Sequence, residues 1–293
     1  MILVTGATGF VGRYVLKELE SRKEPVRLFV RDSSDLTSVQ RDRFEIVYGS
    51  FEDRESVRRA FTGVKTLINI PNLIKGYVDT IIAEAQAAGV ERSIFISTTA
   101  IFTTLPAWTK QFRHAAEEAI RNSGLQPTIV RPTMIYGDHS DGNISRLVRY
   151  MTRYPMIPIA GNGEWLQQPI HVADLAQAIV NMLDTPQTVD KEYNLGGATP
   201  LSYNDLLDTT ARALGKRVYK MHIPVGMILP VVRFYNKLTK RPFIKVEQIQ
   251  RLNEHKAFDY VNAADDFGYA PRSYEEGIVQ QVQQMRSVGA IRA

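Results

Sequence analysis

The sequence predicts an α/β protein with a doubly wound parallel sheet and a smaller C-terminal lobe. In the first 135 residues, short β-branched runs alternate with segments of helical period at intervals of roughly 20–25 residues, which is typical of βαβ units. The expected strands are nearly continuous apolar runs, as when helices cover both faces of a sheet. A glycine-rich turn directly follows the first strand. Together these observations indicate a Rossmann-type sheet.

Six strands are expected in this first part of the chain, where β-branched and aromatic residues gather between turn residues. They are Ile2–Val4, Val26–Val30, Phe44–Tyr48, Thr66–Ile70, Ser93–Ser97 and Thr128–Arg131. Two helices are indicated by apolar residues at helical spacing, namely Val11/Val15/Leu19 and Val78/Ile81/Ile82/Ala85. Asp53 stands where an N-cap residue would open a third helix.

After Pro132 this rhythm loosens, and turn residues become more frequent. We expect loops around the prolines and glycines of residues 155–163 and one more strand near Tyr193–Leu195. Three further helices are predicted at Ile144–Tyr154, Tyr203–Leu214 and Val246–Leu252. We therefore divide the chain into a dinucleotide-binding core, residues 1–135, and a smaller substrate or partner lobe, residues 136–293, with strands returning to the core.

Composition excludes several classes of site and partner. The chain has 293 residues and no cysteine, so it has no disulfide framework, no thiolate nucleophile and no Cys-based metal site. The absence of cysteine fits a reducing compartment, and we expect a cytoplasmic location. The formal net charge of +5 is small for this length and is typical of a mixed, soluble surface. The alternative is attraction to an anionic ligand, and nucleic acid is disfavoured as a partner.

No membrane-spanning segment is expected. The chain opens directly on an apolar strand, without the basic and apolar regions of a leader peptide. The most apolar later run, Ile223–Val232, has about half of the roughly twenty residues that a spanning helix needs. It predicts a buried or interfacial helix, which leaves peripheral membrane contact open.

The glycine-rich turn carries the strongest functional signal. Gly6, Gly9 and Gly12 have a G-x-x-G-x-x-G spacing between the first strand and the first helix. Glycines allow the backbone to turn closely, and the helix N-terminus then presents free N–H groups and a positive dipole end to a pyrophosphate. The context of strand, turn and helix predicts a dinucleotide-binding site.

The residue after the second strand bears on cofactor choice. A carboxylate there would accept hydrogen bonds from the adenosine ribose, but this chain has Arg31 followed by Asp32. An arginine can pair with a 2′-phosphate through charge-assisted hydrogen bonds, which favours NADP over NAD. In the alternative, Arg31 is merely exposed and Asp32 contacts the ribose.

Three segments carry a resemblance to a known family: Thr5–Gly12, Arg131–Gly137 and Gln168–Asp174. With them, nearly the whole chain resembles the extended and atypical short-chain dehydrogenase/reductases. That group includes NAD-dependent epimerases and dehydratases, NmrA-like cofactor sensors and the nucleotide-binding accessory subunit of respiratory complex I. The motifs are specific for the superfamily and do not specify a substrate.

The resemblance implies a set of cofactor contacts and a catalytic hydroxyl. In the outer part of the cleft the implied contacts are Gly6, Thr8, Gly9, Phe10, Val11, Gly12 and Arg31. In the inner part they are Ile70, Thr98, Arg113 and Pro132. The family places a Ser or Thr at the end of the fifth strand, which corresponds to Thr99. The alternative for Thr99 is a structural threonine whose hydroxyl is satisfied by the backbone.

The chain departs from the family at the proton donor. The family uses a Tyr-x-x-x-Lys pair on the next helix, but here Thr109 occupies the Tyr position and Arg113 the Lys position, and no tyrosine lies between Tyr77 and Tyr136. Threonine has no accessible acidity near neutral pH, and arginine stays protonated. Tyr77 or His114 would have to substitute from neighbouring loops.

Two functional classes follow. The first is an NADP-dependent oxidoreductase, or an epimerase or dehydratase relative, that acts on a small carbonyl, a quinone or a nucleotide-sugar. The second is a non-catalytic cofactor-binding redox sensor or assembly factor with a protein partner. An open polar cleft favours catalysis, and a cleft filled by Trp108 and Phe112 favours sensing. The oligomeric state stays open.

Two further clusters of polar residues are interpreted as structural. His171 and Asp174 lie three residues apart at an expected helix start, in a pattern that resembles the family's structural helix opening. His139 with Asp138 and Asp141 forms a polar turn that is more typical of a solvated loop than of a metal site. We therefore expect no metal ion.

Overall fold

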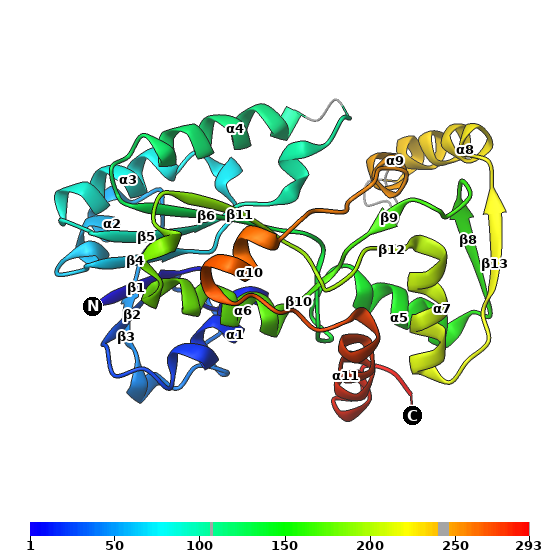
Figure 1. Ribbon diagram of the computed structural model, residues 1–293, viewed down its shortest axis with the longest axis horizontal. Helices are drawn as coiled ribbons and strands as arrows, with labels where there is room; N and C mark the ends of the chain where they lie inside the picture. Colours follow the sequence, from blue (N-terminus) through cyan, green and yellow to red (C-terminus); the bar gives the residue numbers. More distant parts are fainter. Residues whose placement is uncertain (106–107, 240–245, 293) are drawn as a thin grey trace.

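The computed structural model describes residues 1–105, 108–239 and 246–292. Its centre is a seven-stranded sheet in the order β11-β6-β5-β4-β1-β2-β3, and every neighbouring pair in it is parallel (Figure 1). The strands are β1 (Ile2–Thr5), β2 (Val26–Val30), β3 (Glu45–Tyr48), β4 (Thr66–Asn69), β5 (Arg92–Ile96), β6 (Pro127–Pro132) and β11 (Lys191–Leu195). The chain order reverses between β1 and β4. The predicted Rossmann-type fold is confirmed.

Helices cover both faces of this sheet, as the continuous apolar strands predict. On one face lie α1 (Phe10–Leu19) and α6 (Val172–Asn181), which pack against each other. On the other face lie α2 (Arg54–Phe61), α3 (Val78–Ala87) and α4 (Trp108–Arg121). Asp53 caps α2 as predicted, because its carboxylate accepts a hydrogen bond of 3.1 Å from the Glu55 N–H.

The C-terminal lobe has a core of its own and lies beyond the carboxyl ends of the strands (Figure 1). Its helices are α5 (Ile144–Arg153), α7 (Tyr203–Leu214), α8 (Val225–Leu238), α9 (Val246–Leu252) and α11 (Tyr274–Ser287). Its short strands are β7 (Ile135–Tyr136), β8 (Met156–Ala160), β9 (Leu166–Gln167), β10 (Ile170–His171), β12 (Leu201–Ser202) and β13 (Tyr219–Ile223). Between them the chain returns to the core through α6, β11 and α10 (Val261–Phe267).

Two expectations for this lobe need correction. The prolines and glycines of residues 155–163 predict loops only, but Met156–Ala160 forms β8, which pairs in parallel with β13. Pro158 is tolerated because β8 pairs on one side only, so its missing N–H costs no ladder hydrogen bond. The apolar run Ile223–Val232 lies mainly in α8, none of whose residues is buried, so the buried alternative is wrong.

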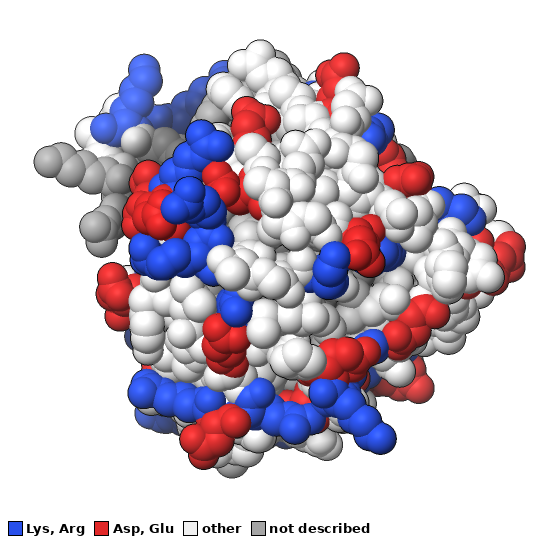
Figure 2. Space-filling view, turned by 90° about the vertical axis from the view of Figure 1, so that its left-hand side faces the viewer, with Lys and Arg blue, Asp and Glu red and all other residues white. Residues whose placement is uncertain are grey.

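Among the residues that the structure describes, no helix is both long and apolar enough to cross a bilayer. Figure 2 shows the side of the molecule where the strands of the central sheet begin, and basic and acidic side chains lie close together there, around a wide uncharged area.

Candidate active site

The glycine turn lies at the carboxyl end of β1, where the strand order reverses. Gly6 has a φ of +72°, which a residue with a side chain rarely adopts, and the Gly9 N–H donates to the Gly6 carbonyl at 3.0 Å. A Cβ atom on Gly12 would overlap the carbonyl oxygens of Gly6 and Ala7. The spacing of the glycines therefore lets the first turn of α1 pack directly on the backbone of the loop.

The N-terminus of α1 is free to bind an anion. Its N-cap residue is Gly9, which has no side chain to accept a hydrogen bond, and its first turn holds no acidic residue. The N–H groups of Phe10, Val11 and Gly12 therefore have no acceptor within the helix. They point toward the space beyond the strand ends, together with the positive end of the helix dipole. This arrangement fits the pyrophosphate of a dinucleotide.

The neighbouring strand β4 ends against this turn. Thr5 donates a hydrogen bond of 2.8 Å to Asn69 Oδ1. Pro71 packs so close to Gly6 that a Cβ atom on Gly6 would lie only 2.9 Å from the proline ring. Asn69 is fully buried, and its Nδ2 has no hydrogen-bond partner among the described residues. Ile70 is half-buried between these residues, at the floor of the predicted cleft.

Arg31 is exposed at the carboxyl end of β2, next to β1. Its backbone N–H donates to Ser34 Oγ at 3.1 Å, and its carbonyl accepts from the Ser34 N–H at 2.9 Å, so the turn that carries it is held in place. Its guanidinium makes no ion pair among the described residues. Asp32 is exposed in the same turn, so both alternatives for the ribose contact stay open.

The two threonines after β5 are engaged by the backbone. Thr98 accepts a hydrogen bond from the Ala100 N–H at 3.2 Å. Thr99 is buried and donates to the carbonyl of Pro132, at the end of β6, at 3.2 Å. This geometry corresponds to the structural alternative for Thr99. Its catalytic role stays a prediction, since the hydroxyl would have to leave the Pro132 carbonyl to reach a substrate.

Helix α4 brings together Thr109 and Arg113, which the resemblance assigns to the family's Tyr and Lys positions. Arg113 Nη1 donates to Thr109 Oγ1 at 2.9 Å across one helical turn, and Arg113 is only 8% exposed. One turn further, Glu117 is fully buried; it accepts from Ser97 Oγ at 2.5 Å and from Arg131 Nε at 2.9 Å. Residues at i, i+4 and i+8 thus place two opposite charges on the helix face that meets the strand ends.

Glu117 was not predicted as part of the site. Burial alone lowers the pKa of Arg131, but the hydrogen bonds and charge of Glu117, with Glu192, raise it above its ordinary value. The carboxylate therefore ties α4 to β5 and β6 at the end of the sheet where ligands bind. The sequence signal that could have found it is an acidic residue in helical register with Thr109 and Arg113.

Neither proposed substitute for the missing tyrosine is placed for proton transfer. The Tyr77 hydroxyl donates to the Asn72 carbonyl at 2.6 Å, and its ring stacks on Phe51 at 4.2 Å. Burial raises the pKa of Tyr77 well above its ordinary value. His114 is exposed on α4, one residue away from the buried face. Phe112 is also exposed, and the side chain of Trp108 lies outside the described residues.

The interpretation of His171 and Asp174 as structural is confirmed. His171 caps α6, since its Nδ1 accepts from the Ala173 N–H at 3.3 Å, and burial lowers its pKa to about 4. Asp174 forms a two-oxygen ion pair with Arg272, at 2.7 Å from its Nη2.

The polar turn after β7 is likewise used inside the protein. Asp138 accepts from Ser140 and lies 3.5 Å from Arg13, while Asp141 accepts from two backbone N–H groups at the start of α5. His139 contacts Gln284. The described residues include no group of three potential metal ligands.

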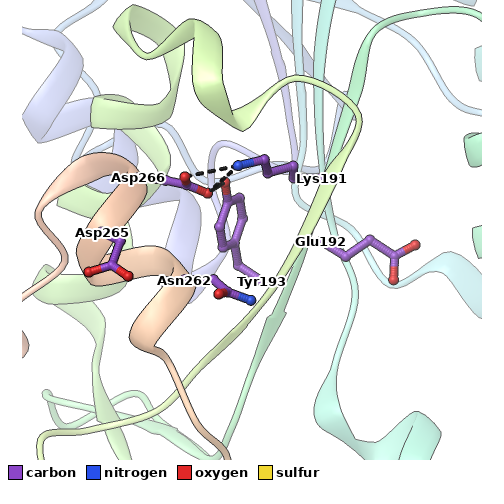
Figure 3. Close-up of a pocket in the computed structure, with 6 residues that line it drawn as sticks. All are labelled: Lys191, Glu192, Tyr193, Asn262, Asp265 and Asp266. Atoms are coloured by element: carbon purple, nitrogen blue, oxygen red, sulfur yellow. Dashed lines mark hydrogen bonds and ion pairs between the residues drawn. The ribbon is translucent and has the colours of Figure 1, made fainter.

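A cavity of 360 Å³ lies elsewhere, between β11 and α10 (Figure 3). In it Asp266 pairs with Lys191 at 2.7 Å and accepts from the Tyr193 hydroxyl at 2.6 Å. Its other lining residues are Glu192, Asn262 and Asp265. Lys191 is the first residue of β11, whereas ligands of such sheets bind at the carboxyl ends of the strands. This hollow is therefore a feature of the sheet edge and separate from the candidate site.

Comparison with known families shows that the glycine turn belongs to a region that matches a cofactor-binding family. A family model described as NAD(P)H-binding matches residues 6–186, which includes the turn, α4 and the sheet as far as β6. The chain belongs to this NAD(P)H-binding family. The resemblance to the extended and atypical short-chain dehydrogenase/reductases is confirmed, and the family's cofactor is NAD or NADP.

Relatives of this NAD(P)H-binding protein include both enzymes and a respiratory subunit. It is 27% identical over 261 residues to the mitochondrial NADH dehydrogenase (ubiquinone) 1 alpha subcomplex subunit 9 of Arabidopsis thaliana, covering 82% of this chain and 64% of that subunit. The chain thus spans slightly less than two thirds of that relative's length. It is 25% identical to a ceramide reductase of Caulobacter vibrioides, with 83% and 81% of the two chains covered.

Solved structures with the same fold include an epimerase and a quinone oxidoreductase. A UDP-glucose 4-epimerase from Thermotoga maritima superposes with a TM-score of 0.76 at 19% identity, over 98% of this chain and 99% of that one. An NADPH-dependent quinone oxidoreductase from Escherichia coli also has a TM-score of 0.76 and 19% identity, over 95% and 98%. At these identities the likeness shows the fold alone.

Proposed function

We propose that this protein is an NADP-dependent oxidoreductase that reduces a small carbonyl or quinone without a tyrosine acid. The observation that carries the proposal is the buried Arg113, held by Thr109 at the position where the family has its catalytic pair. A fixed cation at this point can stabilise negative charge on an acceptor oxygen even though it cannot supply a proton. The cofactor, when bound, supplies the hydride.

The cofactor would lie across the reversal in strand order. The first turn of α1 would hold the pyrophosphate, with Gly6, Thr8, Gly9, Phe10, Val11 and Gly12 as contacts. Arg31 would pair with the 2′-phosphate, since its exposed guanidinium has no ion pair among the described residues and follows directly on β2. Ile70, Thr98, Arg113 and Pro132, at or near the carboxyl ends of β4, β5 and β6, would line the nicotinamide end.

The class of acceptor follows from the absence of a Tyr-x-x-x-Lys pair in α4. Hydride transfer to a carbonyl or quinone leaves an oxyanion that must be stabilised and then protonated. Arg113 would stabilise this charge, and solvent water would deliver the proton. A quinone is the favoured acceptor, because the hydroquinone anion is stable enough to be protonated by water after hydride transfer. A nucleotide-sugar substrate for residues 136–293 is less favoured, since epimerisation and dehydration also require an enzyme-bound base.

A second candidate function is binding without catalysis. It is supported by the absence of a tyrosine in α4 and by the similarity to the complex I subunit of Arabidopsis thaliana. In this case the cofactor would report redox state or stabilise an assembly, and the lobe of residues 136–293 would contact a protein partner. The cytoplasmic location stays a prediction, since that relative is mitochondrial.

Nucleotide titration of the purified full chain tests the cofactor assignment. We expect NADPH to bind at least tenfold more tightly than NADH. Arg31→Asp should weaken NADPH roughly ten- to a hundredfold, because a charge-assisted hydrogen bond is lost and a like charge is introduced. Arg41→Asp is the matched control, since Arg41 is exposed in the same β2–β3 connection, and it should leave both affinities unchanged. Unchanged cofactor preference in Arg31→Asp would contradict the assignment.

A further inference from the structure

Positive charge is concentrated in one stretch of the C-terminal lobe. Residues 209–246 contain nine of the chain's 36 basic residues and none of its 31 acidic ones. The remainder of the chain therefore has 27 basic and 31 acidic residues, a net charge of −4. The whole positive excess of the protein thus resides in a stretch that runs from α7 through β13 and α8 to the start of α9.

Helix α8 in this stretch exposes an apolar stripe. Met227, Val231, Phe234 and Leu238 recur at spacings of four, three and four residues, so they share one side of the helix, and each is between 66% and 71% exposed. The opposite side holds the half-buried residues, which face the protein: Val225, Ile228, Leu229, Val232 and Asn236. Large apolar side chains exposed in such a row are unusual on a soluble surface and indicate an interaction site.

Cations flank this exposed stripe. Arg233 and Lys237 are one turn apart on the flank between the two sides of α8, and both are exposed. Neither makes an ion pair among the residues that the structure describes. The preceding strand β13 adds two more exposed apolar side chains, Tyr219 at 70% and Met221 at 42%. α8 lies at the end of the lobe away from the central sheet, so this surface is separate from the glycine turn (Figure 1).

We propose that α8 docks the protein on the surface of an anionic phospholipid bilayer. The helix would lie in the plane of the interface, with its exposed apolar stripe among the acyl chains and with Arg233 and Lys237 at the lipid phosphates. Charge decides the choice of occupant. A second copy of this chain would bring Arg233 and Lys237, which make no ion pair among the described residues, close to the same two cations of its partner, whereas an anionic leaflet attracts them. The proposal is independent of the oxidoreductase assignment.

Vesicle flotation with the full-length protein tests this docking. We expect binding to phosphatidylcholine vesicles that contain phosphatidylglycerol, and at least tenfold weaker binding to pure phosphatidylcholine. Arg233→Gln with Lys237→Gln should weaken binding roughly 25-fold, about fivefold for each cation removed near the surface. Phe234→Gln with Leu238→Gln should weaken it at least roughly tenfold, because apolar area no longer enters the bilayer.

Two controls separate docking from other effects. Val288→Gln removes an exposed apolar side chain at the end of α11, outside the cationic stretch, and should leave vesicle binding unchanged. NADPH affinity should be the same in all variants, which shows that they fold. Equal binding to both vesicle types, no binding to either, or a dimer in solution that Phe234→Gln with Leu238→Gln dissociates would each overturn the proposal.

Discussion

The glycine turn after β1 and the inner face of α4 are two parts of one candidate site, but they are specified in different ways. In the turn, backbone atoms form the candidate site. The glycines allow α1 to pack closely on the loop, and the first N–H groups of α1 have no acceptor within the helix and can bind an anion. On α4, side chains form the candidate site, and Thr109, Arg113 and Glu117 follow one another at intervals of one helical turn. The turn agrees with its family, while α4 departs from it. The turn therefore follows the family's pattern for cofactor binding, whereas α4 lacks the family's Tyr-x-x-x-Lys pair.

Replacing Gly12 is expected to have the largest effect, because it disrupts the turn itself. In Gly12→Val, a side chain would overlap the carbonyl oxygens of Gly6 and Ala7, so α1 must move away from the loop. NADPH affinity should fall more than roughly a hundredfold, since the first-turn N–H groups no longer converge on the pyrophosphate. Titration of the variant by fluorescence checks this.

The matched control for this variant is Gly142→Val. A Cβ on Gly142 meets no atom within 4 Å and its φ is not positive, so the change should be tolerated. Equal NADPH affinity in Gly12→Val and the native chain would show that the turn is not the binding site.

Replacing Glu117 removes the contacts that join α4 to Ser97 and Arg131, and it leaves the glycine turn intact. Glu117→Gln removes the buried charge that faces Arg131, which keeps Glu192 as a partner, so the loss of charged hydrogen bonds should cost roughly 1.5–3 kcal/mol of folding free energy. Chemical denaturation should show this loss. Glu118→Gln, at the exposed neighbouring position, should change stability by less than about 0.5 kcal/mol. Equal stability of the two variants would mean that the ion pair does not hold α4 in place.

Sequence predicts the turn well because its requirements are local. Strand, glycine spacing and helix follow each other within a dozen residues, so the required context can be read directly from the order of the residues. The predicted strands and helices of the core agree with the structure to within one or two residues at their ends, as for β2 (Val26–Val30). In the C-terminal lobe, α7 (Tyr203–Leu214) has the predicted bounds.

The parts that sequence could not predict depend on distant contacts. Glu117 belongs to the site only because β5 and β6 bring Ser97 and Arg131 to it. Pairing of β8 with β13 joins segments about sixty residues apart, and neither shows a period that distinguishes it from a loop. The apolar run in α8 reads as a buried helix by composition, and only the fold shows which of its sides is left uncovered.

The central claim is that hydride transfer persists with Arg113 in place of an acid–base pair. The most direct test follows NADPH oxidation at 340 nm with a quinone acceptor, for the native chain, Arg113→Met and the exposed neighbour variant His114→Gln. The account predicts turnover by the native chain and by His114→Gln, and a kcat roughly a hundredfold lower in Arg113→Met. Tight NADPH binding by the native chain without turnover on any quinone or carbonyl would contradict it, and would favour a protein that binds the cofactor without using it.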